Sequence, residues 1–151
     1  MAVCAHVSKV SKDYSPYGYS VMESAATDIT TAVSPGVGGG PLALMDDAAA
    51  WLERVVIGSP TGYAAGDAAG NLWTVQVTAY TAAGVATVVA SWSSFADGAA
   101  VGLTANVGQS LSISPNEIPA GSSLVVNVAK TGTPAGGTLN ASVFVRYRRK
   151  A

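Results

Sequence analysis

The sequence predicts an all-β protein, an antiparallel β-sandwich or jelly roll with an extended N-terminal arm, and two observations carry this prediction. Apolar and polar side chains alternate near the C-terminus, so that Leu139, Val143, Val145 and Tyr147 would share one face of a strand. A period of two is typical of antiparallel strands that are buried on one side. Short apolar runs also recur roughly every 8–14 residues without alternating helical segments, which is typical of sandwiches and jelly rolls.

Seven or eight strands are expected, separated by glycine- and proline-containing turns. The clearest of them, in chain order, are residues 51–57, 72–80, 85–92, 99–105, 110–114, 122–129 and 138–148.

Two of these runs allow alternative interpretations. Asp46 and Asp47 are suited to cap a short helix, whereas the β-branched residues Val55, Val56 and Ile57 favour a strand in the same region. The run 85–92 is apolar on both faces, so it is expected either inside the core or in a subunit interface.

The chain divides into two parts at a linker rich in glycine and proline, SPGVGGGP, at residues 34–41. Residues 1–41 are predicted to form an extended arm plus this linker, and residues 42–151 the β domain. Tyr14, Tyr17 and Tyr19 lie in the arm and are candidate anchors on a partner, because tyrosine offers a large contact area at low entropic cost. The alternatives are an arm packed on its own domain or one that is disordered in isolation.

The composition favours a protein that meets other surfaces. Charged residues make up 11% of the chain and hydrophobic residues 49%, which fits either an extensive interface or a small domain covered by serine and threonine. The net charge of −1 provides no overall field for nucleic acid or an anionic membrane, so neither is expected as a direct partner. No apolar run reaches membrane-spanning length and the N-terminus lacks a signal-like apolar segment, so synthesis in the cytoplasm is expected.

No catalytic, cofactor or metal site is expected. Cys4 and His6 cannot complete a zinc site alone, and the carboxylates are scattered without calcium-loop spacing. Trp51, Trp73 and Trp92 are interpreted as core residues in preference to a carbohydrate-binding platform.

The basic residues gather at the C-terminus. Alternation would place Arg146 and Arg148 on the outward face of the last strand, with Arg149 and Lys150 in a tail. They are candidates for contact with an acidic partner, and the alternative is a solvated chain end.

The last 50 or so residues resemble small structural proteins of tailed bacteriophages, in particular head decoration (cement) proteins and related fibre modules. The resemblance rests on residues 103–111, on the segment IPAGS at 118–122, on LVVNVAKTG at 124–132, and on the final strand at 142–148. It implies a sandwich or jelly-roll subunit, commonly a trimer, on the outside of an icosahedral head.

The expected function is therefore that of a non-enzymatic virion protein that binds the major capsid protein and itself, as a homotrimer on the capsid exterior. The alternative is a head-fibre, tail-fibre or receptor-binding module whose β domain binds host glycans through Tyr63, Trp92 or loop residues.

Overall fold

The structure is a computed structural model that describes residues 43–44 and 49–149, with side chains described from 49 to 148. Within these residues it contains ten β-strands and no helix, so the prediction of an all-β fold is confirmed. The predicted arm and linker, including Tyr14, Tyr17 and Tyr19, lie outside the described residues.

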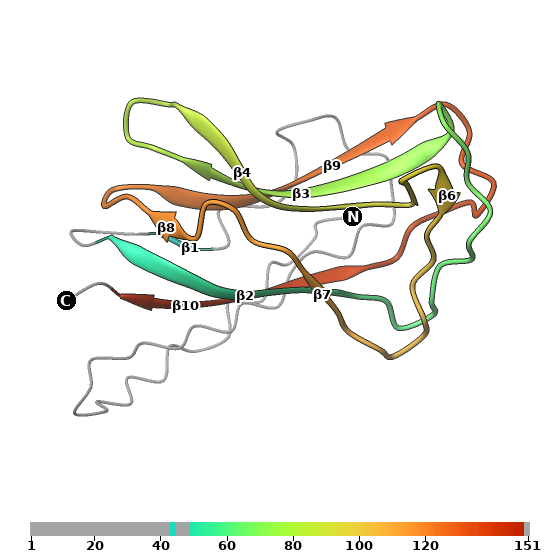
Figure 1. Cartoon of the computed structure of the whole chain (residues 1–151), viewed down its shortest axis with the longest axis horizontal. Helices are drawn as coiled ribbons and strands as arrows, with labels where there is room; N and C mark the ends of the chain where they lie inside the picture. The colour runs from blue at the N-terminus through green and yellow to red at the C-terminus, as the bar shows by residue number, and fades with distance from the viewer. Residues whose placement is uncertain (1–42, 45–48, 150–151) are drawn as a thin grey trace, which may run out of the picture.

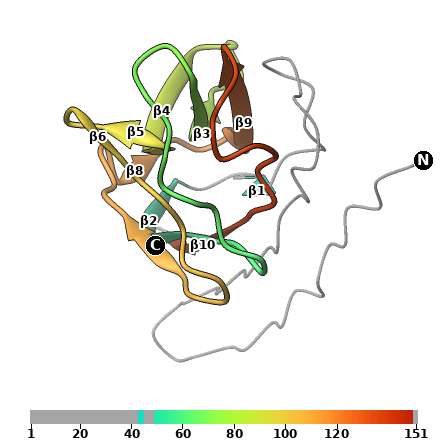
Figure 2. The same ribbon diagram turned by 90° about the vertical axis from the view of Figure 1, so that its right-hand side faces the viewer.

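Two antiparallel sheets face each other and form a sandwich (Figures 1 and 2). The first sheet has the strand order β1-β9-β3-β4, and the second has the order β10-β2-β7, with β8 also paired to β2. A small hairpin, β5-β6, stands apart from both. The bounds are β1 Ala43–Leu44, β2 Ala50–Gly58, β3 Leu72–Tyr80, β4 Ala86–Ser93, β5 Phe95–Ala96, β6 Ala99–Ala100, β7 Gln109–Leu111, β8 Glu117–Ile118, β9 Ser123–Thr131 and β10 Ser142–Arg149.

The core lies between the sheets and consists of alternate residues of the long strands. On β10 the buried side chains are Val143, Val145 and Tyr147, as the sequence pattern predicts. On the facing sheet Trp73, Val75 and Val77 of β3 pack beside Leu124, Val126 and Val128 of β9. One-sided burial of this kind fixes the register, because a slip by one residue would expose every core side chain.

β2 carries a bulge halfway along, and the alternation of buried and exposed side chains changes phase there. Leu52 and Val55 are both buried, and the two residues between them, Glu53 and Arg54, both point to solvent. The pairing with β10 shifts at this point, with Tyr147 opposite Leu52 and Arg146 opposite Arg54. Glu53 is thus the extra residue of a bulge, which keeps the apolar residues on either side of it in the core.

Several predicted elements differ from the structure in length or position. Residues 51–57 form a strand and not a helix. The predicted strand 99–105 is wrong beyond Ala99–Ala100; Leu103 and Ala105 make only isolated bridges. The strand predicted at 110–114 is Gln109–Leu111, and Glu117–Ile118 forms a short strand within the predicted turn.

The C-terminal strand also differs from its prediction at both ends. Leu139 is buried as predicted, and Ala141 is buried on the same side, but β10 begins only at Ser142. Arg149 was predicted to lie in a tail, and this is wrong because its backbone pairs with Ala50 at the end of β10. The jelly-roll form of the sandwich stays a prediction.

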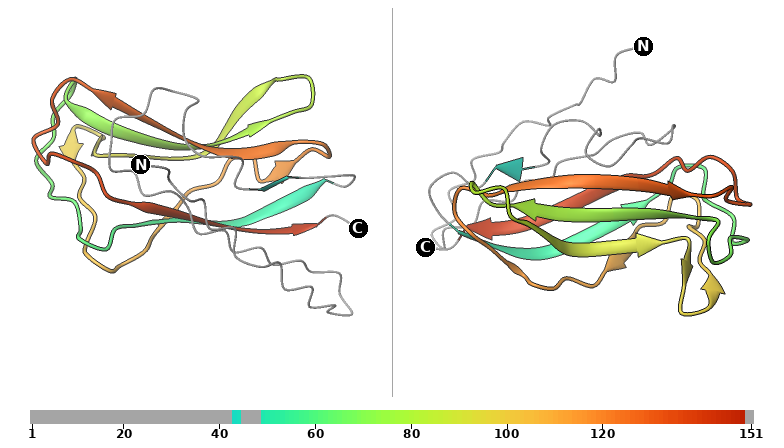
Figure 3. Two further views of the ribbon diagram at one scale, coloured as in Figure 1. Left: turned by 180° about the vertical axis from the view of Figure 1, so that it is seen from behind. Right: turned by 90° about the horizontal axis from the view of Figure 1, so that it is seen from above.

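Three connections gather at one end of the sandwich (Figures 1 and 3). They are the β2–β3 loop, the β5-β6 hairpin and the β9–β10 loop. Tyr63 in the first loop pairs with Leu103 beyond the hairpin, through backbone hydrogen bonds of 2.8 and 2.9 Å. This end of the molecule is therefore built from segments far apart in the sequence.

Candidate functional site

The outer face of the β2–β10 pair gathers most of the described positive charge. The register places Arg54 directly opposite Arg146, and it places Arg148 opposite Trp51. Like charges directly opposite each other in a sheet are unfavourable, so this pairing needs a compensating group.

Glu53 compensates the charge of the β10 arginines but not that of Arg54, because the bulge puts it within reach of β10. Its Oε2 lies 3.3 Å from Nε of Arg146, and its Oε1 lies 3.6 Å from Nε of Arg148. One carboxylate therefore serves two guanidinium groups, while Arg54 forms no ion pair among residues 49–148. A second carboxylate, Glu117 on β8, stands on the far side of Trp51.

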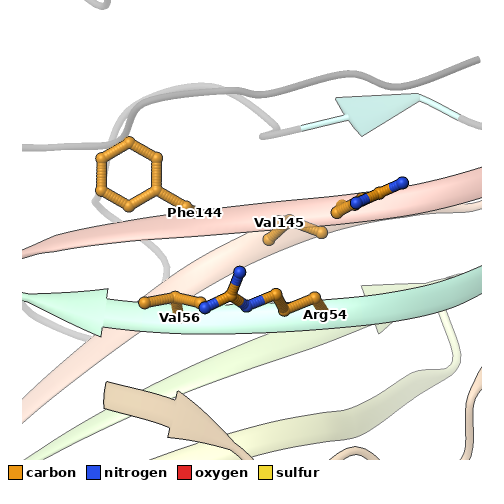
Figure 4. A pocket seen from close by; sticks show the side chains of 5 residues that line it. Arg54, Val56, Phe144 and Val145 are labelled. Carbon is orange, nitrogen blue, oxygen red and sulfur yellow. The ribbon is translucent and has the colours of Figure 1, made fainter. Parts of the chain in front are cut away.

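A shallow pocket of about 250 Å³ opens between these charges (Figure 4). It is lined by two arginines and three apolar residues: Arg54, Val56, Phe144, Val145 and Arg146. Phe144 is 41% exposed, which is high for an aromatic residue in a strand. The pocket thus combines free positive charge with an accessible apolar surface.

Of the six predicted contact residues, the structure brings Arg146 and Arg148 together on the outward face of β10, as alternation predicts. The side chain of Arg149 and the three arm tyrosines lie outside the described part. Sequence analysis missed Arg54 and Phe144. The signal for Arg54 was present in the run Leu-Glu-Arg-Val at 52–55, where two consecutive charged residues between apolar ones interrupt the period of two.

A second cluster of polar groups surrounds Asp67 at the loop end of the sandwich. The carboxylate is buried, and its Oδ2 accepts hydrogen bonds from the Tyr63 hydroxyl at 2.7 Å and from the Ser94 hydroxyl. Its Oδ1 accepts a bond of 3.1 Å from the backbone N–H of Gly136. Asp67 therefore ties together three loops that are distant in the chain.

Neighbouring contacts extend this cluster into the core. The Ser94 hydroxyl accepts a hydrogen bond from the backbone N–H of Trp73, and the Trp73 indole donates to the carbonyl of Gly137, both at 2.9 Å. The Tyr63 ring packs edge-to-face on Trp92, with centroids 6.1 Å apart. The Asp67 carboxylate, the Tyr63 and Ser94 hydroxyls and the Trp73 indole N–H all have internal partners, which indicates a structural role.

The ionisation of Asp67 and Tyr63 follows from this geometry. Burial raises the pKa of Asp67, but the hydrogen bonds from Ser94, Gly136 and Tyr63 outweigh it and hold the pKa below its usual value. Burial, followed by the hydrogen bond to Asp67 and the charge of that carboxylate, raises the pKa of Tyr63.

The lowered pKa of Asp67 predicts a loss of stability in acid. The unfolded carboxyl titrates near 3.8, above its folded value, so between the two values the unfolded state binds more protons. The contribution of Asp67 is complete above pH 3.8 and declines as the pH falls through the folded pKa. Asp67→Asn should remove this part of the pH dependence in urea unfolding measured from pH 7 to pH 2; an unchanged slope would contradict the assignment.

Three of the aromatic residues considered for a glycan platform are buried. Tyr63, Trp73 and Trp92 are each at most 5% exposed, which confirms the core assignment of Trp73 and Trp92 and removes Tyr63 and Trp92 as surface-binding residues. Trp51 is half-buried on the outer side of β2 and is not part of the core, so its interpretation as a core residue is wrong. In the described part of the chain, no group of three or more His, Cys, Asp or Glu side chains gathers into a metal site, and no helix could cross a membrane.

Comparisons with known proteins suggest no function, so a proposal must start from the fold and from the two clusters described above. No family model, no curated protein and no solved structure matches the chain.

Proposed function

We propose that the chain is a non-enzymatic virion structural protein, a decoration or cement protein that binds the outer surface of a phage head and stabilises it, as a homotrimer. The observation that carries the proposal is an uncharged, exposed sheet edge on β4. The resemblance of the C-terminal third to decoration proteins supports the same assignment.

β4 is the last strand of its sheet and pairs only with β3 among the described strands. No charged residue occurs between Asp67 and Asp97, so both β3 and β4 lack charge completely. Val85 is 59% exposed and Val88 is 42% exposed along this edge. Proteins usually protect open edges with charge, proline or covering segments, so an uncharged apolar edge is typical of a surface that another subunit covers.

The edge is not open along its whole length. The carbonyl of Val89 accepts a hydrogen bond of 2.9 Å from the N–H of Ser114, next to the point where the β3–β4 pairing shifts. The exposed apolar part of the edge therefore lies before this contact, at Val85 to Val88. In a closed trimer this edge would meet a different surface of the next subunit, because head-to-tail contacts generate rings.

Val88→Lys should convert the oligomer to monomer. A lysine at this position places a charge on the interface and blocks edge pairing. Size-exclusion chromatography with light scattering gives the mass directly. The matched control is Val107→Lys, which changes a valine that is 53% exposed outside the edge and should leave the mass unchanged. If the wild-type chain is already a monomer at assembly concentration, the edge is not a subunit interface.

The assignment as a structural protein is supported by how the described carboxylates are used. Asp67 is enclosed by three donors, and Glu53 balances two arginines. Many copies of a modest contact on a repeated lattice would add through avidity, which a surface of low charge suits.

Binding to heads that lack the protein tests the proposal. The purified chain should saturate such heads at a fixed ratio to the coat protein and raise their melting temperature. Deletion of residues 1–33 should abolish this binding and leave the oligomer intact. Binding that survives the deletion would contradict the role assigned to the arm, and no binding by the full chain would contradict the decoration function.

A further inference from the structure

We infer that the pocket on the outer face of β2 and β10 is a receptor for one acidic side chain of a partner protein, with the carboxylate held between Arg54 and Arg146. That the partner protein is the head lattice rests on the proposed function. That the pocket binds a carboxylate does not depend on it.

The charge balance of the pocket points to an anion. Arg54 has no ion-pair partner among the residues from 49 to 148, and it faces Arg146 across the strands. Arg146 is 53% exposed and shares its one carboxylate, Glu53, with Arg148. A guanidinium group has five N–H donors, so both Arg54 and Arg146 keep donors for an incoming group. An anion between them would also relieve the unfavourable pairing of like charges.

The apolar residues point to a side chain and not to a free inorganic anion or a nucleic-acid backbone. Val56 lies directly opposite Phe144 in the same pocket, and Phe144 is exposed. Figure 4 shows Arg54 and Val56 together on β2, with Phe144 and Val145 on the neighbouring strand. An aspartate or glutamate flanked by an aliphatic residue would satisfy both parts of this surface.

The size of the pocket agrees with this ligand. Its volume of about 250 Å³ is below the roughly 300–1,000 Å³ typical of small-molecule and cofactor sites. It sits on paired strands, so the backbone positions of the two arginines are fixed directly opposite each other. Such a site can take the tip of one protruding residue from a neighbouring surface.

Titration of the full chain with acetyl-Leu-Glu-Leu-amide, followed by NMR, tests the pocket directly. The backbone signals of Arg54, Val56 and Phe144 should shift, and acetyl-Leu-Gln-Leu-amide should produce no such shift. Arg54→Gln should weaken binding at least about tenfold. Lys130→Gln removes the same charge from the other sheet and should leave the affinity unchanged.

A second variant should change the affinity for the peptide in the opposite direction. Glu53→Gln removes the competing carboxylate from Arg146 and should strengthen binding about threefold, the size of one exposed ion pair, a gain that a merely destabilised protein would not show. Equal binding of the Glu and Gln peptides, equal affinity of wild type and Arg54→Gln, or tighter binding of inorganic phosphate at these residues would each overturn the inference.

The test on particles separates this inference from the proposed function. If the chain decorates heads and Arg54→Gln decorates them equally well, the pocket is not the lattice contact and the decoration function stands. If the peptide binds as expected but the chain does not bind heads, the pocket stands and the decoration function fails.

Discussion

Replacing Asp67 by alanine should lower the free energy of unfolding by about 3 kcal/mol, because it leaves two buried hydroxyls and one partly buried N–H without an acceptor. The Tyr63 hydroxyl, the Ser94 hydroxyl and the Gly136 N–H all bond to this carboxylate. Asp67→Asn should cost about 1–2 kcal/mol, since the amide oxygen can still accept from Gly136 and the hydroxyls can rotate to accept from the amide nitrogen. Urea unfolding at pH 7 measures both.

Asp97→Asn is the matched control for this prediction. Asp97 is exposed in the β5-β6 turn with φ of 52°, a conformation that asparagine also tolerates. Its replacement should change stability by less than about 0.5 kcal/mol. If the two asparagine variants are equally stable, the Asp67 cluster does not hold the loop end together.

Replacing Gly136 by alanine should destabilise the protein by about 2 kcal/mol through overpacking. A Cβ atom on Gly136 would lie 2.5 Å from Cζ of Tyr63. The ring cannot easily retreat, because it packs edge-to-face on buried Trp92 and its hydroxyl is bonded to Asp67. Thermal and urea unfolding should both show the loss.

Gly66→Ala provides the comparison from the same end of the sandwich. The nearest atom to a Cβ on Gly66 is Cβ of Ala135 at 3.9 Å, an ordinary contact. This variant should be neutral or slightly stabilised, because alanine restricts the unfolded chain. A loss at Gly66 equal to that at Gly136 would mean that the space beside Tyr63 does not decide the cost.

The long strands could be predicted because burial on one side leaves a local signal. In β3, β9 and β10 every second residue faces the core, and the alternation is visible within each strand. The prediction of a strand at 99–105 fails because the second half of this segment runs beside a loop and not beside another strand. Gly102 runs so close to Tyr63 that an added Cβ would lie 2.7 Å from the Tyr63 carbonyl oxygen.

The two clusters depend on contacts between distant segments, which no local pattern reveals. Ser94 is 27 residues from Asp67 and Gly136 is 69 residues from it. In the sequence, Asp67 is therefore only one polar residue in a loop rich in glycine and alanine. The outward direction of Arg146 and Arg148 could be predicted from β10 alone. The pairing of Arg54 with Arg146 could not, because the bulge at Glu53 shifts the register between β2 and β10.

The copy number of the chain in purified virus particles tests the central proposal most directly. Quantitative mass spectrometry against the major coat protein gives this number. A lattice-wide decoration protein should be present at a ratio comparable to that of the coat protein. A ratio far below it would contradict lattice-wide decoration and favour a fibre or receptor-binding position, and absence from the particle would contradict a virion function altogether.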